Sequence, residues 1–317
     1  MSTTLLEVSR LCAGYGAHPA VADVSLSLRR AEILCLVGES GCGKTTVLRA
    51  LLCAPEVKWF SGEITLEAAA LSGMSEKARR GLCSQRLGVV FQSPEASFNP
   101  IRSYRRQFIE TLKSHGSYNP ATFEREVASA FARVALKDWR RVLNACPYAL
   151  SGGMNQRVAL ALAMLLGQDI LLCDEPTSAL DATIQLSVAK EIKKLRDETG
   201  IAQIIVTHNL ALAGFLADNI GVMYAGRLVE LGRANDVLGR PCHPYTKSLI
   251  AAVPGLEGTM PTGLPGSPPL SGPRQKGCEF MERCPGARVE CAERCYAFGQ
   301  VGDGHFAACD AGKEGEI

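Results

Sequence analysis

A glycine-rich loop between an apolar run and a helical stretch most constrains what this chain can fold into. Residues 33–37 read ILCLV, a continuous apolar run of the kind found in a buried parallel strand. Residues 38–45 fit the pattern G-x-x-x-x-G-K-[ST], and a helix is predicted to begin near Lys44. In such a loop the backbone N–H groups turn around a phosphate, and the helix N-terminus adds its dipole. The segment therefore predicts a nucleotide bound where a strand of an α/β fold ends.

Two side chains of the loop have specific expected roles. Lys44 places a point charge on the β- and γ-phosphates, and Thr45 offers its hydroxyl to Mg²⁺. A glycine-rich turn beside a surface lysine is the simpler alternative, but the strand before the loop and the helix after it favour a phosphate loop. The predicted ATP contacts in this segment are Gly38, Glu39, Ser40, Gly41, Cys42, Gly43, Lys44, Thr45 and Thr46.

Polar residues follow three other apolar runs. Asp174 and Glu175 end one run. The carboxylate of Asp174 is expected to hold Mg²⁺, and that of Glu175 is expected to polarise the water that attacks the γ-phosphate. Gln92 follows a second run and can reach both Mg²⁺ and that water, and His208 ends a third, where a γ-phosphate contact is needed. Nucleotide sites collect at the carboxyl ends of parallel strands, which favours these roles over solvent-facing acids and a structural histidine.

A second anion cradle is predicted at Ser151, Gly152 and Gly153, which precede a strongly apolar helix. A serine before two glycines at a helix start combines backbone N–H groups with the helix dipole. One nucleotide does not need two cradles in one chain. We therefore expect this cradle to clamp a nucleotide that is bound to a partner subunit.

The order of the apolar runs predicts an α/β fold class. Alternating runs bounded by turns indicate antiparallel strands at 5–11, 21–28 and 63–67. Continuous apolar runs indicate buried, mostly parallel strands at 33–37, 87–91, 170–173 and 203–206. Helical patterns, including 122–136 and 155–166, fill about 93–166 and predict a helical insertion.

The composition changes after residue 253, where a stretch rich in Pro and Gly precedes a cysteine-rich tail. The spacing of Cys278, Cys284, Cys291 and Cys309 brings four thiolates into a short segment, which suits either Zn²⁺ or a [4Fe–4S] cluster. Short C-x2-C pairs are absent from this set, which weakens the zinc alternative. Cys295 is a possible substitute ligand, and unligated or oxidised cysteines are a third possibility.

Charge and hydropathy exclude several classes of protein. Lys and Arg number 34 against 32 Asp and Glu, so electrostatics give no support for general nucleic-acid binding. The sequence has no apolar run long enough to span a bilayer, and its start lacks the basic and apolar parts of a secretory signal. We therefore expect a protein made and kept in the cytosol.

The motifs together resemble those of the ABC transporter ATPase family over about residues 1–250. The matching residues are Tyr15, the loop at 38–45, Gln92, the cradle at 151–153, Asp174, Glu175, the 178–181 segment with Asp181, and His208. The resemblance implies a P-loop NTPase cassette: a RecA-like parallel sheet, an antiparallel β subdomain and a helical insertion. It also implies that Tyr15 stacks on adenine, that Asp181 belongs to the D-loop, and that two cassettes sandwich two ATP molecules.

A narrower resemblance is to the ATPases of oligopeptide, dipeptide and nickel importers. It rests on residues 91–100 (FQSPEASFNP), residues 243–249 (HPYTKSL) and the cysteine tail. It implies a cassette at 1–253, a small cysteine-rich domain at 254–317, and a [4Fe–4S] cluster on the four cysteines. It also implies a second ATPase subunit, identical or homologous, two permeases, an extracytoplasmic substrate-binding protein, and a peripheral location on the cytoplasmic face of the membrane.

Other functions remain as alternatives at this level. Nickel or a metal chelate is the second choice of cargo after peptides. A soluble ABC ATPase acting on ribosomes or DNA, and a redox-regulated ATPase that uses the tail, are less favoured. Ala31 departs from the usual glycine of the family and Asn155 varies the signature, but neither change removes a catalytic group. We therefore expect a chain that hydrolyses ATP.

Overall fold

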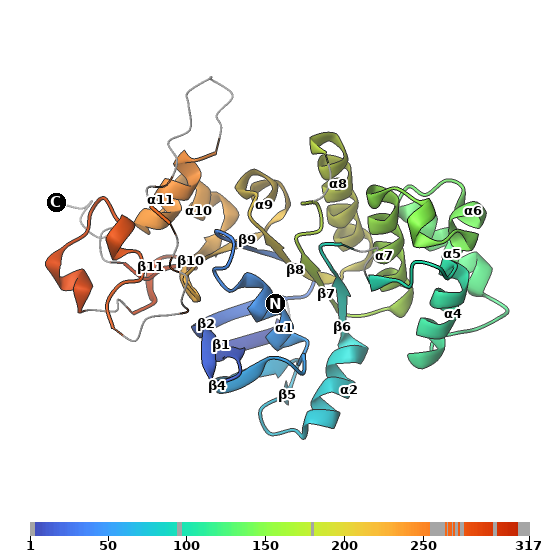
Figure 1. Ribbon diagram of the computed structural model, residues 1–317, viewed down its shortest axis with the longest axis horizontal. Helices are drawn as coiled ribbons and strands as arrows, with labels where there is room; N and C mark the ends of the chain where they lie inside the picture. The colour runs from blue at the N-terminus through green and yellow to red at the C-terminus, as the bar shows by residue number, and fades with distance from the viewer. Residues whose placement is uncertain are drawn as a thin grey trace. The chain divides into compact units, whose positions relative to one another are not determined.

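The computed structural model describes residues 4–93, 97–178, 181–253 and, with short gaps at 265, 268, 270–271, 273–275 and 294–296, residues 264–309. The chain divides into two compact units, with residues 1–80 and 206–317 in unit 1 and residues 81–205 in unit 2 (Figure 1). Helix α2 (Glu76–Arg86) contains the boundary. Among the described residues, no helix combines the length and the apolar character needed to cross a membrane.

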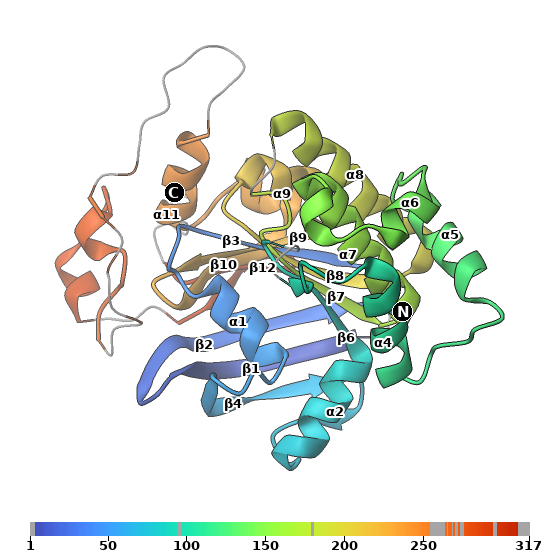
Figure 2. The same ribbon diagram turned by 45° about the vertical axis from the view of Figure 1, so that its right-hand side comes forward.

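Unit 1 contains an antiparallel sheet with the strand order β2-β1-β4-β5. The strands are β1 (Thr4–Tyr15), β2 (His18–Arg29), β4 (Lys58–Leu66) and β5 (Ala69–Ala70). Figures 1 and 2 show β1, β2 and β4 side by side. The predicted strand at 5–11 is longer than expected, because Gly14 lets the backbones of β1 and β2 meet closely at the hairpin: a Cβ there would lie 2.1 Å from the carbonyl oxygen of His18.

A second sheet region of unit 1 runs in the order β11-β12-β10-β9-β3. Its strands are β3 (Ile33–Val37), β9 (Asn219–Tyr224), β10 (Arg227–Arg233), β11 (Gly299–Gly302) and β12 (His305–Ala307). Strand β3 is buried throughout and pairs in parallel with β9, as its continuous apolar run predicts. Strand β12 pairs antiparallel with β10, so the C-terminal tail adds strands to the sheet that contains β3.

The helices of unit 1 accompany these strands. They are α1 (Lys44–Leu51), α9 (Leu210–Leu216), α10 (Ala234–Gly239) and α11 (Pro244–Ala251), with short 3-10 turns η2 (Met281–Arg283) and η3 (Val289–Ala292) in the tail. Helix α1 contacts β1, β2 and β4, and it buries the predicted apolar face that includes Val47, Leu48 and Leu51. The start of α1 is thereby fixed at the end of the glycine-rich loop.

Unit 2 joins a short parallel sheet to a group of helices. The strands, in the order β8-β7-β6, are β6 (Leu87–Val90), β7 (Ile170–Asp174) and β8 (Ala202–Thr207), the last of which ends in unit 1. The helices are α4 (Tyr104–Ser114), α5 (Phe123–Arg133), α6 (Trp139–Asn144), η1 (Pro147–Ala149), α7 (Gly152–Leu166) and α8 (Ala182–Thr199). Tyr104, Phe108 and Phe131 pack edge to face in the core of this group.

Candidate functional site

The glycine-rich loop connects β3 to α1 and depends on glycine at specific positions. Gly38, Gly41 and Gly43 have φ values of 153°, 82° and 101°, which side chains rarely tolerate. A Cβ at Gly38 would lie 2.2 Å from the carbonyl oxygen of Met223, and one at Gly43 would lie 2.6 Å from Cγ1 of Val21. Gly38 and Gly43 therefore have no room for a side chain, whereas at Gly41 only the positive φ favours glycine.

Lys44 lies at the first position of α1 and turns its ammonium back onto the loop. Its Nζ donates hydrogen bonds to the carbonyl oxygens of Gly38 at 2.7 Å and Glu39 at 2.8 Å. The side chain is 5% exposed, so the charge sits where backbone N–H groups and a helix N-terminus also gather. Burial raises the pKa of the neighbouring Cys42 thiol above its ordinary 9.0, although the Lys44 charge acts the other way. Cys42 is therefore a protonated, small apolar side chain at neutral pH.

Two further predicted residues belong to unit 1. Tyr15 ends β1 and is 38% exposed, and its hydroxyl lies 3.5 Å from Oγ1 of Thr46 on α1. His208 follows β8 directly and is exposed. The next residue, Asn209, caps α9 by accepting a hydrogen bond from the N–H of Leu212, so the chain turns sharply after His208.

Unit 2 holds the predicted acids and Gln92 at the ends of neighbouring strands. Strands β6 and β7 are parallel, and Val90 pairs with Cys173. Gln92 and Glu175 each come two residues later, so they leave the sheet at the same edge. Glu175 has a φ of 46°, a strained backbone for a residue other than glycine, and its carbonyl oxygen accepts from both the N–H and the hydroxyl of Ser178. The turn after β7 is thus fixed through its main chain.

Ser151 caps α7, as the cradle prediction expects. Its Oγ accepts a hydrogen bond from the N–H of Met154 at 3.4 Å, and Gly152 and Gly153 form the first turn of the helix. Asp181 caps α8 in the same way, because its Oδ1 accepts from the N–H groups of Thr183 and Ile184. Both predicted residues therefore stand at helix N-termini.

The predicted site residues are divided between the two units. Unit 1 contains Tyr15, Gly38 to Thr46 and His208; unit 2 contains Gln92, Ser151 to Gly153, Asp174, Glu175 and Asp181.

The four predicted cysteine ligands line one small cavity in the tail. Cys278, Cys284, Cys291 and Cys309 surround it together with His243 and Phe280. The N–H of Cys278 donates to the carbonyl oxygen of Cys291, which closes the segment around the cavity. Burial raises the pKa of Cys278 to about 11, and it also raises the pKa of Cys284. Four cysteine side chains around one cavity offer thiolates to a metal centre, whose positive charge would offset the cost of ionising buried thiols. Their sulfur atoms do not form a group within 4.8 Å of one another, which is the spacing that a single ion needs. Cys295 lies outside the described residues.

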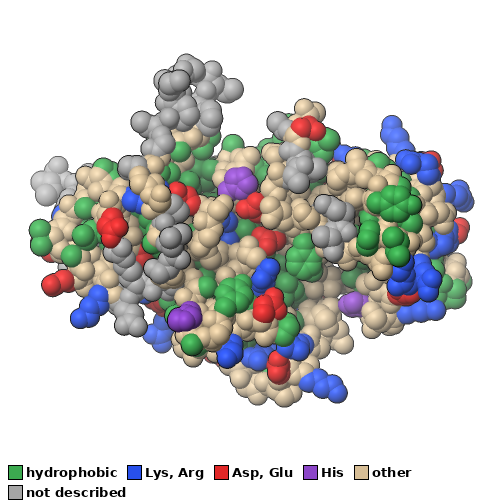
Figure 3. Space-filling model, viewed as in Figure 1, with side chains coloured by type: hydrophobic (Ala, Val, Ile, Leu, Met, Phe, Trp, Pro, Cys, Tyr) green, Lys and Arg blue, Asp and Glu red, His purple; other side chains and the backbone are tan. Residues whose placement is uncertain are grey.

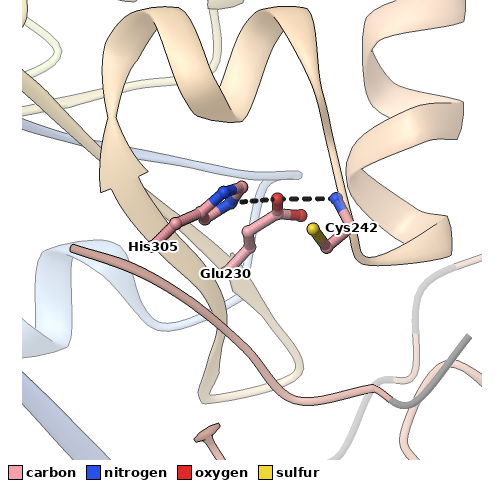
Figure 4. A group of neighbouring side chains, drawn as sticks. All are labelled: Glu230, Cys242 and His305. Carbon is pink, nitrogen blue, oxygen red and sulfur yellow. Dashed lines mark hydrogen bonds and ion pairs between the residues drawn. The ribbon is translucent and has the colours of Figure 1, made fainter. Parts of the chain in front are cut away.

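A group of Glu230, Cys242 and His305, of which Glu230 and His305 are buried and Cys242 is half-buried, has no counterpart in the sequence predictions (Figure 4). Glu230 is fully buried on β10, and its oxygens accept from the backbone N–H of Cys242 at 2.8 Å and of His243 at 2.9 Å. Its Oε1 also lies 2.8 Å from Nε2 of His305 on β12. These contacts supply the hydrogen-bond partners that a buried carboxylate needs, and through them Glu230 ties the segment before α11 and the tail strand β12 to β10.

The sequence predictions also missed a contact between the tail and the glycine-rich loop. Arg283, in η2, forms an ion pair with Glu39 at 2.7 Å. The two residues are 244 positions apart, and no local pattern links them. The only signal in the sequence is an acid inside a phosphate loop, where a negative charge needs a partner.

Comparison with known proteins gives a consistent family. Residues 21–178 match the family model described as ABC transporter, and residues 229–291 match the model described as oligopeptide/dipeptide transporter, C-terminal region. The chain is 36% identical to the dipeptide transport ATP-binding protein DppD of Bacillus subtilis, over 93% of this chain and 89% of DppD. It is also 36% identical to the oligopeptide transport ATP-binding protein OppD of Salmonella typhimurium, over 92% of this chain and 89% of OppD.

Solved structures agree on the fold. The structure of cbiO1 from Clostridium perfringens, part of the ABC transporter complex cbiONQ, matches with a TM-score of 0.66 and 23% identity, covering 75% of this chain and 92% of cbiO1. The dimeric ATP-binding cassette MJ0796 bound to ADP and Pi matches with a TM-score of 0.63 and 24% identity, covering 73% of this chain and 99% of MJ0796. The predicted cassette fold is confirmed. The chain belongs to the ATP-binding, ATP-hydrolysing subunits of ABC transporters, in the oligopeptide/dipeptide group.

Proposed function

We propose that this chain binds and hydrolyses ATP to drive a membrane importer of dipeptides or oligopeptides. The observation that carries the proposal is the glycine-rich loop, whose three positive φ values and buried Lys44 make a cradle for phosphates at the end of β3. Relatives that align over about nine-tenths of the chain are named as dipeptide and oligopeptide transport proteins, which favours peptides over nickel as the cargo.

In this proposal the loop residues and Tyr15 bind ATP. The backbone N–H groups of 38–46 surround the β- and γ-phosphates, and Lys44 exchanges its two carbonyl partners for phosphate oxygens. Tyr15 is partly exposed at the end of β1, beside the first turn of α1, and can stack on adenine. The nucleotide thereby replaces contacts that Lys44 otherwise makes within the loop.

The hydrolytic step is assigned to the strand-end residues. Glu175 orients the attacking water, His208 contacts the γ-phosphate, and Gln92 reaches that water. Thr45, Gln92 and Asp174 would hold Mg²⁺, and these hydroxyl, amide and carboxylate oxygens are ligands that Mg²⁺ prefers. When bound, Mg²⁺ neutralises charge on the phosphate oxygens.

The cradle at Ser151 to Gly153 and the cap at Asp181 are assigned to a nucleotide that a second ATPase subunit holds. Each stands at the N-terminus of a helix of at least 15 residues, where N–H groups and the dipole favour anions. We propose that the second subunit is identical or homologous to this chain. Closure of such a pair on ATP, and its opening after hydrolysis, would be the motion that drives transport.

Further partners are two membrane-spanning permeases, with an extracytoplasmic binding protein beyond them. Ile101 is 79% exposed and Tyr148 is 75% exposed, so unit 2 presents large apolar side chains on its surface. Figure 3 shows hydrophobic side chains among Lys and Arg side chains over the part of the surface formed by α4 to α7. This surface suits a permease contact, which would place the chain on the cytoplasmic face of the membrane.

The tail at 254–317 is proposed to form a small domain around a [4Fe–4S] cluster, with Zn²⁺ as the alternative. The support is the arrangement of four cysteines around one cavity. Anaerobic purification should give a brown protein with about four irons per chain. Colourless protein with one zinc per chain would contradict the cluster and support the zinc site. Protein without metal would contradict both proposals.

Transport by the assembled complex tests the proposed function. The chain and its partners, reconstituted into vesicles with ATP on the side of this chain, should take up a labelled dipeptide or oligopeptide. Unlabelled peptide should compete with that uptake, and Ni²⁺ should not. Uptake of ⁶³Ni that peptides do not inhibit would contradict the peptide assignment.

A further inference from the structure

Glu39, the second residue of the glycine-rich loop, is held by the C-terminal tail. Arg283 donates two hydrogen bonds to its carboxylate, from Nη1 to Oε2 at 2.7 Å and from Nη2 to Oε1 at 3.0 Å. This two-pronged geometry is the stronger form of an arginine–carboxylate pair. Arg283 lies in η2, between Cys278 and Cys284, so the contact joins the cysteine-rich segment to the loop.

Arg283 is itself fixed in a buried aromatic setting. Its side chain is 5% exposed, and Nη1 also donates to the hydroxyl of Tyr224 at 3.3 Å. Phe280 packs against the rings of Tyr224 and Tyr245, with centroids 5.2 Å and 5.4 Å apart. A buried guanidinium requires its carboxylate partner, and these rings leave it little freedom to move. The position of Glu39 therefore follows the position of η2.

The main chain of Glu39 is held as well. Its N–H donates to the hydroxyl of Tyr245 on α11 at 3.0 Å, and its carbonyl oxygen accepts from Nζ of Lys44 at 2.8 Å. Thus one residue of the loop is anchored by its side chain and its N–H to residues more than 200 positions away. The loop is shaped from outside as well as by its own glycines.

The negative charge of Glu39 explains why this anchor would matter for nucleotide binding. A carboxylate in a loop that receives a triphosphate would repel it, because like charges at short range are unfavourable. Arg283 neutralises that carboxylate and directs it toward the tail. We infer that Arg283 is a positioning residue for nucleotide binding, which acts by holding and neutralising Glu39. The inference rests on the proposal that residues 38–46 bind the nucleotide.

The competing explanation is that Arg283 only fastens the tail to unit 1. The chain offers a matched control, because Arg227 on β10 forms an ion pair with Glu279 at 2.6 Å. Glu279 belongs to the same tail segment as Arg283, but neither Arg227 nor Glu279 belongs to the glycine-rich loop. Loss of either arginine should loosen the tail, whereas only loss of Arg283 should change nucleotide affinity.

A double-mutant cycle on the full chain, purified anaerobically, tests the inference. The variants are Arg283→Met, Glu39→Gln, their combination and Arg227→Met, and the measured quantity is the Kd for MgATP by calorimetry. We expect Arg283→Met to weaken MgATP binding about tenfold. Addition of Glu39→Gln to Arg283→Met should restore the affinity to within about threefold of the wild type, and Arg227→Met should change it less than about twofold. Wild-type affinity in Arg283→Met, an equal loss in Arg227→Met, or no recovery in the combination would overturn it.

Two further measurements separate positioning from folding. Tyr245→Phe removes only the hydroxyl that accepts from the N–H of Glu39, and it should weaken MgATP binding about threefold. In the assembled transporter, Arg283→Met should raise the KM for ATP and leave kcat within about twofold, a split that misfolding would not produce. Unchanged MgATP affinity in Lys44→Ala would contradict the proposal that the loop binds phosphates. Weaker MgATP binding in Lys44→Ala, together with wild-type binding in Arg283→Met, would contradict only this inference.

Discussion

Replacement of Gly38 by alanine tests the geometry of the loop directly. The added Cβ would lie 2.2 Å from the carbonyl oxygen of Met223, whereas real Cβ atoms essentially never come within 3.0 Å, so the loop or β9 must move by about 0.8 Å. The obstacle is backbone, which cannot rotate away. Such a movement also displaces the Gly38 carbonyl that accepts from Nζ of Lys44.

The expected magnitude combines two costs. A residue other than glycine at this φ costs about 1–2 kcal/mol, and a forced overlap in a packed region costs about 1–3 kcal/mol. Together they give about 3 kcal/mol, which corresponds to a loss of about 100-fold in affinity if the strain falls on the nucleotide-binding conformation. Gly41→Ala is the matched control: its φ is 82°, and a Cβ there meets nothing within 4 Å. Only the backbone cost of about 1 kcal/mol remains, or about fivefold.

Calorimetric titration with MgATP measures both variants, and urea unfolding checks that each is folded. We expect Gly38→Ala to lose at least ten times more affinity than Gly41→Ala, as the difference of about 2 kcal/mol implies. Equal losses in the two variants, or wild-type binding by Gly38→Ala, would refute the reasoning from close contact with Met223.

Three more predictions concern other parts of the chain. Glu175→Gln should bind MgATP but lose most of its ATPase activity in the assembled transporter, about 100-fold or more, and normal turnover would contradict the role of Glu175. Tyr104→Phe should lower the free energy of unfolding by about 1–2 kcal/mol in urea titration, because the buried Oδ1 of Asn155 loses a 2.6 Å hydrogen bond; an unchanged midpoint would contradict this. Because burial holds the pKa of Cys42 above 9.0, its alkylation by iodoacetamide, followed by mass spectrometry, should be slow at pH 7 and accelerate toward pH 10, and fast labelling at pH 7 would show a thiolate.

The strands and helices could be predicted where local pattern and burial agree. The run at 33–37 coincides with β3, and the helical pattern at 122–136 covers α5. The pattern at 155–166 found most of α7 but missed its first turn, because Gly152 and Gly153 have low helix propensity and the cap at Ser151 decides the start.

Contacts between distant segments could not be predicted in the same way. Strand β12 pairs with β10 although the tail has no long apolar run, and the pairing brings His305 to the buried Glu230. Asn155 stands out in the sequence only as a variation of the signature, yet it is 3% exposed and hydrogen-bonded to Tyr104 and to the carbonyl oxygen of Pro147. These contacts depend on which polar groups meet after folding, and no local pattern in the sequence indicates the pairs.

The central claim is that the loop after β3 and the ammonium of Lys44 hold a triphosphate. Calorimetric titration of the full chain with ATP, with and without Mg²⁺, in the wild type and in Lys44→Ala measures this most directly. We predict Mg²⁺-dependent binding by the wild type and affinity at least about 100-fold weaker in Lys44→Ala, because a buried charge–phosphate contact is lost. Equal affinity in the two proteins, or no binding by the wild type even with its partners assembled, would contradict the account.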